Sequence, residues 1–322
     1  MMSANLQQVV AEHGPWTAMA IKLADGSYTR APAVDHRLGR LVQIALDLSG
    51  KPLSAARVVD LGCLEGHYAI EFALQGCEVL GIEGRAASVA KCEFARASLG
   101  LERLRFVQDD VRNFTRSRYG QFDIVLCSGL LYHLPAPDAW KLLCAMHEAC
   151  SGMLIIDTFV SLAAQASVEL GGRTYHGHFY GEHEADDSPE AKAAKLWASL
   201  DNARSFWFTE PSLLNLLQRA GFTSVFDALL PAMPGFPRDR KTYVAVKGSR
   251  ARVLSSDPTD GRARAEIPEG VNPLCDPSQT RRGPLFHAAR RLLPQPVKDL
   301  VKPALRAVGY LPPDRTPWFQ RK

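Results

Sequence analysis

The stretch RVVDLGCLEGH, residues 57–67, determines how the rest of the sequence is interpreted. A short β-branched run ends in an acid, a glycine turn follows, and an apolar helical pattern begins at once, which predicts strand, tight loop and helix. Such a unit opens a doubly wound α/β sheet, where a nucleotide-like ligand lies over the carboxyl ends of the strands. Gly62 lets the loop pass close to that ligand, and Gly66 lets the helix start against the strand. The N–H groups at the helix start would suit a carboxylate.

Three further stretches repeat the pattern of an apolar strand that ends in polar groups. Residues 79–83 (VLGIE) place Glu83 23 positions after Asp60, near the ~20-residue gap expected for a carboxylate that binds ribose hydroxyls. Residues 106–111 (FVQDDV) end a strand in a carboxylate pair, and residues 122–128 (FDIVLCS) form a buried strand that opens on a polar turn. A glycine loop alone is a weak signal, and the spaced acids strengthen it.

The order DLGCLEG, GIEG, VQDDV and FDIVLCSGLLYHL resembles the class I S-adenosylmethionine-dependent methyltransferases. Within that family it is most similar to the branch related to the tRNA wobble-uridine modifying enzymes and to small-molecule methyltransferases of the same branch. The resemblance covers residues 55–160 well and extends loosely to about residue 248. It implies S-adenosyl-L-methionine as the cofactor; NAD is disfavoured, because no hydride-transfer motif follows. One departure is Leu64, where the family usually has Gly, so the loop is less permissive.

The resemblance also implies a set of cofactor-binding residues: Asp60, Gly62, Cys63, Gly66, Glu83, Asp109, Asp110, Val111 and Ser128. The first acid and the glycines would form the wall beside the methionine part, with a strand-end cap as the alternative for Asp60. Glu83 would hold the ribose hydroxyls. Asp110 and the backbone of Val111 would contact the adenine edge, with Asp109 as a competitor. Ser128 would line the cavity near the sulfonium.

The candidates for chemistry follow the fourth strand. Displacement of an activated methyl requires alignment and exclusion of water, and a general base only where the nucleophile must lose a proton. His133, in LLYHL (residues 130–134), is the leading candidate base, with a structural histidine as the alternative. Asp157 is the second candidate, as a base or as an orienter of the acceptor. Tyr132 would support the sulfonium through its ring face.

Residues 159–208 interrupt the alternation and are rich in His, Tyr, Gly and acids. We interpret them as a substrate-side insertion with an irregular polar loop, in which His176 and His178 contact the acceptor. HxH followed by HE lacks a specific ligand spacing, so we predict no metal. The aromatic run at residues 206–208 is either packed core or a wall of the acceptor pocket, and Trp207 is its candidate contact.

Overall, the pattern predicts a Rossmann-like, seven-stranded, doubly wound α/β sheet with helices on both faces. Strands are expected at about 57–61, 78–83, 104–108, 122–127, 153–157, 223–230 and 241–247, and helices at about 34–48, 66–75, 86–99, 137–150 and 213–221. Residues 1–33 are expected to be irregular, with Trp16 either packed on the domain or part of a lid. The predicted division is an N-terminal extension and helix (1–50), the methyltransferase domain (51–248) and a basic linker with short helices (249–322).

Composition supports a globular protein of the cytoplasm. The 322 residues are 46% apolar and 22% charged, which is typical of soluble domains, and neither a spanning apolar run nor a signal peptide is visible. Seven cysteines without CxxC spacing indicate reduced thiols. Residues 249–322 carry 14 Lys/Arg against 7 Asp/Glu, a net charge of +7. This tail has a proline-broken helical pattern at 285–310, and either contacts RNA or an anionic membrane or docks on the body.

The predicted function is methyl transfer to a hydroxyl or amine of a small-molecule acceptor, polar or glycosidic. Two alternatives remain at this stage. One is a tRNA-modifying methyltransferase of the wobble-uridine type, with the basic tail as the RNA contact. The other is a non-enzymatic binding protein that keeps the fold with a degenerate loop at Leu64. The sequence leaves the oligomeric state unknown.

Overall fold

The computed structural model describes residues 4–229, 237–251, 254–255 and 267. The chain divides into two compact units, Met1–Leu274 and Cys275–Lys322, and every described residue belongs to the first. The linker and short helices predicted for 249–322 therefore lie almost wholly outside the described residues, as does most of the loop 231–237.

A seven-stranded sheet forms the centre of the first unit, in the order β3-β2-β1-β4-β5-β10-β9. Neighbouring strands from β3 to β5 pair in parallel, whereas β10 lies antiparallel between β5 and β9. The strands are β1 (Arg57–Leu61), β2 (Glu78–Glu83), β3 (Leu104–Gln108), β4 (Phe122–Ser128), β5 (Cys150–Phe159), β9 (Ser224–Asp227) and β10 (Arg240–Val246). The predicted fold class is confirmed, because continuous apolar strands such as β1 are buried on both faces.

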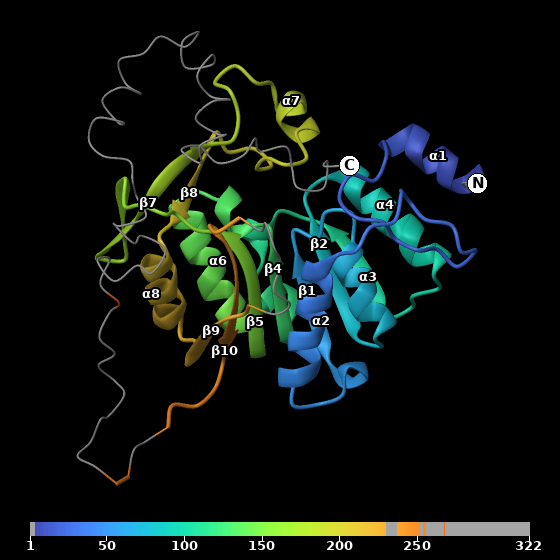
Figure 1. Ribbon diagram of the computed structural model, residues 1–322. Helices are drawn as coiled ribbons and strands as arrows, with labels where there is room; N and C mark the ends of the chain where they lie inside the picture. The colour runs from blue at the N-terminus through green and yellow to red at the C-terminus, as the bar shows by residue number, and fades with distance from the viewer. Residues whose placement is uncertain (1–3, 230–236, 252–253, 256–266, 268–322) are drawn as a thin grey trace, which may run out of the picture. The chain divides into compact units, whose positions relative to one another are not determined.

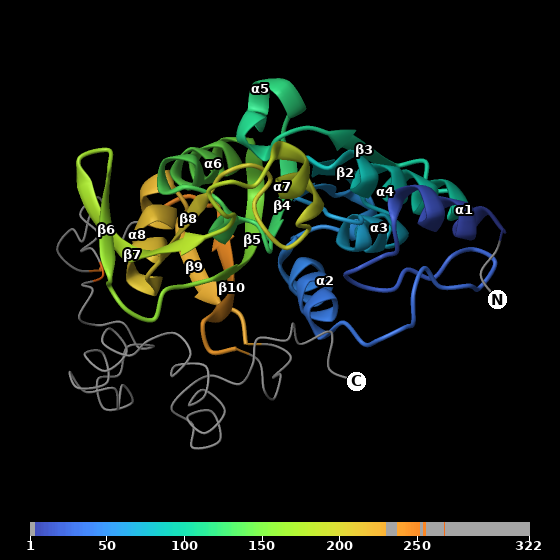
Figure 2. The ribbon, with the colours of Figure 1, turned by 90° about the horizontal axis from the view of Figure 1, so that it is seen from above.

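Helices cover both faces of this sheet (Figures 1 and 2). One face carries α6 (Ala136–Ala149) and α8 (Glu210–Ala220), and the other carries α2 (His36–Leu48), α3 (His67–Leu74) and α4 (Ala86–Ser98). The shorter elements are α1 (Ala4–His13), α5 (Arg116–Tyr119), α7 (Pro189–Ala194), and the 3-10 turns η1 (Leu53–Ala55), η2 (Val111–Asn113) and η3 (Leu131–His133). Within the described residues, every strand and helix predicted up to residue 247 is present, with ends shifted by at most three residues.

Two expectations were wrong. Residues 1–33 are not all irregular, because α1 buries Leu6 and packs Val9 and Val10 against the α2–α4 face. The insertion is not an irregular loop either: β6 (Ala166–Leu170), β7 (Arg173–Gly181) and β8 (Arg204–Phe208) form an antiparallel three-stranded sheet. Gly171 and Gly172, both with positive φ, make the two-residue turn between β6 and β7, a hairpin signal that the polar composition concealed.

Trp16 is buried and its ring lies 6.0 Å from that of Phe94 on α4, so the packing alternative holds for this side chain. The six cysteines in the described part of the chain are free thiols, five of them buried, while Cys275 lies outside the described residues. No helix among the described residues is long and apolar enough to cross a membrane.

Candidate active site

The loop between β1 and α3 adopts a left-handed backbone at three positions. Gly62 has φ 66° and Gly66 has φ 79°. A Cβ on Gly66 would lie 2.9 Å from both Cys92 and Phe106, so only glycine lets α3 start this close to β3 and α4. Leu64, with φ 50°, is the only non-glycine residue of positive φ in the described part of the chain. The loop thus keeps its shape where the family usually has Gly, at a cost of about 1–2 kcal/mol.

Asp60, at the end of β1, is buried, and its Oδ2 has no hydrogen-bond partner among the described residues. Burial raises the pKa of this carboxyl to about 7; the Ala69 backbone opposes the shift and the charge of Glu83 adds to it. Ser128, at the same edge of the sheet, has a buried hydroxyl that also lacks a partner within the described residues. Buried polar groups are normally satisfied, so both atoms offer hydrogen-bonding capacity to a bound ligand.

Glu83, at the end of β2, is buried and connects two loops. Its Oε2 accepts from the Leu64 N–H at 3.0 Å, and its Oε1 accepts from the Arg85 N–H at 2.9 Å. Burial raises the pKa of this carboxyl, against the effect of the Arg85 backbone and charge. Cys63, in the loop between β1 and α3, is buried, and its N–H donates to the carbonyl of Ile82 at 3.1 Å. The residues predicted to bind the cofactor after β1 and β2 are thus brought together.

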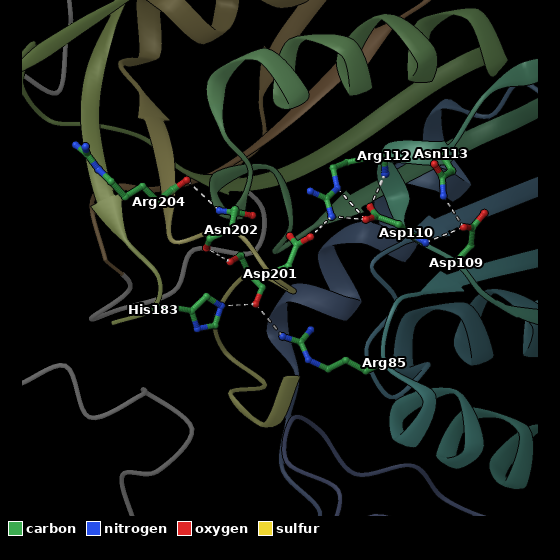
Figure 3. Close-up of polar contacts among 10 residues, drawn as sticks. Arg85, Asp109, Asp110, Arg112, Asn113, His183, Asp201, Asn202 and Arg204 are labelled. Atoms are coloured by element: carbon green, nitrogen blue, oxygen red, sulfur yellow. Dashed lines mark hydrogen bonds and ion pairs between the residues drawn. The ribbon is translucent and has the colours of Figure 1, made fainter. Parts of the chain in front are cut away.

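The acid pair after β3 makes protein contacts (Figure 3). Asp109 accepts from Asn113 at 2.8 Å and pairs with Arg118 at 2.8 Å. Asp110 caps η2, which begins at the buried Val111, and accepts from Nε of Arg112 at 2.8 Å. The role of either acid at the adenine edge stays a prediction.

The segment 182–203, between β7 and β8, extends to the loops after β2 and β3; we call it the strap. The Arg85 guanidinium donates to four strap carbonyls at 2.9–3.2 Å, those of Ala193, Lys195, Ala198 and Ser199. Figure 3 shows Arg85 and His183 pointing toward one backbone carbonyl, which is Ser199 O at 2.9 Å from His183 Nε2. Asp201 of the strap pairs with Arg112 at 2.6 Å. The strap therefore covers the loops that follow β2 and β3.

Aromatic rings gather beyond the ends of β4 and β5. The Trp207 ring stacks on Phe159, with centroids 4.8 Å apart, and on Tyr180, also 4.8 Å apart. The Tyr132 ring lies 5.6 Å from Trp207, and His178 lies 5.2 Å from it. The structure therefore brings the predicted acceptor contacts His178 and Trp207 together with Tyr132 in one aromatic wall, in which Trp207 itself is buried. The third predicted contact, His176, lies two residues before His178 on β7, where its backbone bonds to Thr209 and Ser212.

His133, the last residue of η3, contacts a carboxylate that the sequence did not single out. Its Nδ1 lies 3.0 and 3.1 Å from the two oxygens of Glu182, at the start of the strap. Burial by itself would raise the pKa of Glu182, but the hydrogen bond and charge of His133 hold it below its usual value. The two residues are 49 positions apart, so no local pattern could have joined them.

Asp157, fully buried on β5, lies opposite Ser128 in the register of β4 and β5. Arg240 Nε donates to it at 2.5 Å, Arg37 Nε lies 3.3 Å away, and the Thr242 hydroxyl donates at 2.6 Å. Burial opposes ionisation, yet Arg240 and Arg37 lower the pKa of Asp157. An ionised, doubly paired carboxylate is a poor proton acceptor, so this geometry favours orientation over general-base catalysis. The two arginines were not singled out from the sequence.

A cavity of about 450 Å³ opens between β7 and the strap, lined by Tyr180, Glu182, Lys195 and Trp197 among others. The cavity adjoins the aromatic wall, because Tyr180 stacks on Trp207 and Glu182 contacts His133. No group of three or more His, Cys, Asp or Glu side chains with the arrangement of a metal site exists within the described residues.

The chain matches the family model described as a methyltransferase domain over residues 34–225, which is more than half of its length. It therefore belongs to this family, and its sheet and loops are those of the class I S-adenosylmethionine-dependent methyltransferases. The class that the sequence predicts is confirmed.

Individual proteins support the same class. The N-terminal domain of EvdMO1, solved with SAH bound, is 25% identical with a TM-score of 0.58 over 78% of this chain and 98% of that one. Ubiquinone biosynthesis O-methyltransferases from Cronobacter sakazakii and Escherichia coli are 30% and 32% identical, over 43% and 38% of this chain. This chain covers 55% and 48% of those two proteins, so it spans about half the length of the curated relatives it matches. These relatives do not place it in the wobble-uridine branch.

Proposed function

We propose that this protein is an O-methyltransferase that uses S-adenosyl-L-methionine to methylate a hydroxyl of a small polar or glycosidic acceptor. The observation that carries the proposal is the His133–Glu182 pair, held at 3.0 Å beside the aromatic wall and just beyond the end of β4. This is where an acceptor would meet the methyl group. The names of the two curated relatives reported above, both O-methyltransferases, favour oxygen over nitrogen.

The residues around the glycine loop fit the cofactor. When bound, S-adenosylmethionine supplies a methyl group on a sulfonium, already activated for displacement. Oδ2 of Asp60, which has no hydrogen-bond partner among the described residues, suits the cationic amine of the methionine part. Glu83 lies where the ribose hydroxyls are expected, and the strap above Arg85 excludes water from that side. Gly62 and Gly66 give the loop the left-handed backbone at which a side chain would meet Leu130, or Cys92 and Phe106.

The acceptor side supplies orientation and proton transfer. Tyr180 lines the cavity and would present its ring to a flat or ring-shaped acceptor, backed by the buried Trp207 on which it stacks, and such pockets combine apolar walls with a few polar groups. His133 Nε2 takes the hydroxyl proton as the acceptor oxygen bonds to the methyl carbon and the carbon–sulfur bond breaks, and later releases this proton to solvent. Asp157, held by two arginines, orients groups at the end of β5 and stays ionised.

The test is incubation of the full chain with radiolabelled S-adenosylmethionine and fractionated cell extract. Label in a small molecule or glycan that resists mild base, as an ether does and an ester does not, supports the proposal. Label in RNA would replace it by a tRNA-modifying activity of the wobble-uridine type. If calorimetry shows cofactor binding and no fraction becomes labelled, a binding function of the fold replaces the enzymatic proposal.

A further inference from the structure

We infer that Glu182 is a positioning residue that fixes the His133 imidazole with its proton on Nδ1, so that the Nε2 lone pair faces the acceptor. The inference deepens the proposed function and rests on His133 as the base. It assigns the strap a part in catalysis, in addition to covering the cofactor side.

The geometry sets the tautomer. An ionised carboxylate only accepts hydrogen bonds, and both Glu182 oxygens lie within 3.1 Å of His133 Nδ1. The neutral imidazole must therefore carry its proton on Nδ1, which leaves Nε2 as the acceptor that a general base requires. The His133 ring also lies 4.2 Å from the ring of Tyr132, so its orientation is limited on a second side. Burial leaves 15% of the His133 side chain exposed, enough for one access route.

Glu182 is itself held in place by the strap. Its side chain is 1% exposed, and Oε2 accepts from the Ser199 N–H at 2.9 Å. Its own N–H donates to the Ala203 carbonyl at 2.9 Å. Ser199 is also where Arg85 and His183 bind, so the carboxylate is anchored to the cofactor side of the protein. The lowered pKa of Glu182 keeps it ionised at neutral pH.

A purely structural role for Glu182 makes a different prediction. If the carboxylate only stabilised the strap, its loss would loosen the strap. The tautomer of His133 would then not depend on Glu182. The decisive readout is therefore the protonation site of the ring, which is measurable without any acceptor.

The experiment is long-range ¹⁵N–¹H correlation NMR on the full chain with ¹⁵N-labelled histidine, at a pH where the ring is neutral. His133→Gln, or His133→Asn if the first variant does not fold, identifies the signal. We expect Nδ1 to appear protonated and Nε2 unprotonated in the wild type. Glu182→Gln should lower the Nδ1-protonated fraction, whereas Glu184→Gln, an exposed acid two positions along the strap, should leave it unchanged. A wild-type His133 protonated mainly on Nε2 overturns the inference.

Kinetics separate this inference from the proposed function. With the acceptor found by radiolabelling, Glu182→Gln should lower kcat about tenfold or more, because a misoriented base loses part of its contribution. Its affinity for S-adenosylmethionine, measured by calorimetry, should stay within about twofold of the wild type. A fall in cofactor affinity with unchanged kcat would assign Glu182 to the structure of the strap. If the wild type labels no acceptor, the proposed function fails, while the NMR result still decides the tautomer.

Discussion

The raised pKa of the buried Asp60 carboxyl predicts that cofactor affinity depends on pH. Burial raises its pKa to about 7, so the carboxyl is largely protonated in weak acid. The ammonium and sulfonium of S-adenosylmethionine favour the ionised form, since an opposite charge nearby lowers the pKa of an acid. Binding near neutral pH should therefore release a proton from Asp60, and affinity should rise with pH.

The size of the effect follows from that pKa. With a value of about 7, about a tenth of Asp60 is ionised at about pH 6 and about nine tenths at about pH 8, so affinity should rise about tenfold, or about 1.4 kcal/mol. Stability without the cofactor should change in the opposite sense. The folded pKa lies above the unfolded value of about 3.9, so protonated Asp60 contributes stability below that value, and this contribution is lost as the pH rises through about 7.

The assay is isothermal titration calorimetry with S-adenosylmethionine between about pH 6 and about pH 8, in two buffers of different ionisation enthalpy that report the protons released. Asp60→Asn should bind with nearly constant affinity across this range and release no proton. Glu83→Gln controls for the second buried acid, whose charge contributes to the Asp60 shift. A wild type with constant affinity and no proton release would refute the assignment of a neutral Asp60. Proton release that persists in Asp60→Asn and vanishes in Glu83→Gln would assign the titrating carboxyl to Glu83 instead of Asp60.

Four further outcomes follow from the same contacts. Glu83→Ala should weaken cofactor binding by about 1–3 kcal/mol in calorimetry, as expected when a charged hydrogen-bond partner is lost. His133→Ala should lower turnover in the radiolabel assay about a hundredfold or more, with cofactor affinity retained. Asp157→Ala should lower the unfolding free energy in urea by about 3–5 kcal/mol, because it leaves buried arginines without their carboxylate. A chain ending at Gly248 should lose about 1 kcal/mol or more of stability, because the Asn215 side chain no longer bonds the Ile267 backbone.

Asp157→Ala has a matched control, and each of the other three changes has an outcome that would contradict its prediction. Glu78→Ala removes a half-exposed partner of Arg57 and should cost at most about 1 kcal/mol, against which Asp157→Ala is compared. A near-normal rate for His133→Ala would transfer the base role elsewhere, and unchanged affinity for Glu83→Ala would remove its ribose assignment. If the chain ending at Gly248 is fully stable but no longer sediments with anionic liposomes or binds RNA, the tail is an anchor and not a docked segment.

The sheet could be predicted because its signals are local. β-branched runs that end in Asp60, Glu83 and Ser128 identify both the strands and the edge where the ligand lies. Parallel strands bring those ends together whatever the loops contain, so the cofactor side follows from the strand order. The strand–turn context of His133 likewise gave its position just beyond β4. These inferences needed only periodicity and the rule that parallel strands share an edge.

The acceptor side could not be predicted in the same way, because its contacts join distant segments. Glu182 meets His133 across 49 positions, and Arg240 meets Asp157 across 83. The sequence of strand β7 (RTYHGHFYG) indicates a polar loop because histidines and glycines are interspersed among its aromatic residues, and its pairing with β6 and β8 makes it a strand. The pairing of β7 with its neighbouring strands therefore determined its structure, although its composition indicated an irregular loop.

The strap explains why the resemblance to the methyltransferase family is informative about the cofactor and nearly silent about the acceptor. One end of the strap brings Glu182 to the candidate base, and its later residues bind Arg85 and Arg112, next to the cofactor loops. Substitutions in this one segment therefore change the acceptor pocket and the geometry of the base together, while the strands that hold the cofactor stay the same. Because function is carried by such segments added to a common fold, the strap and β7–β8 are where acceptor specificity should be sought by mutagenesis.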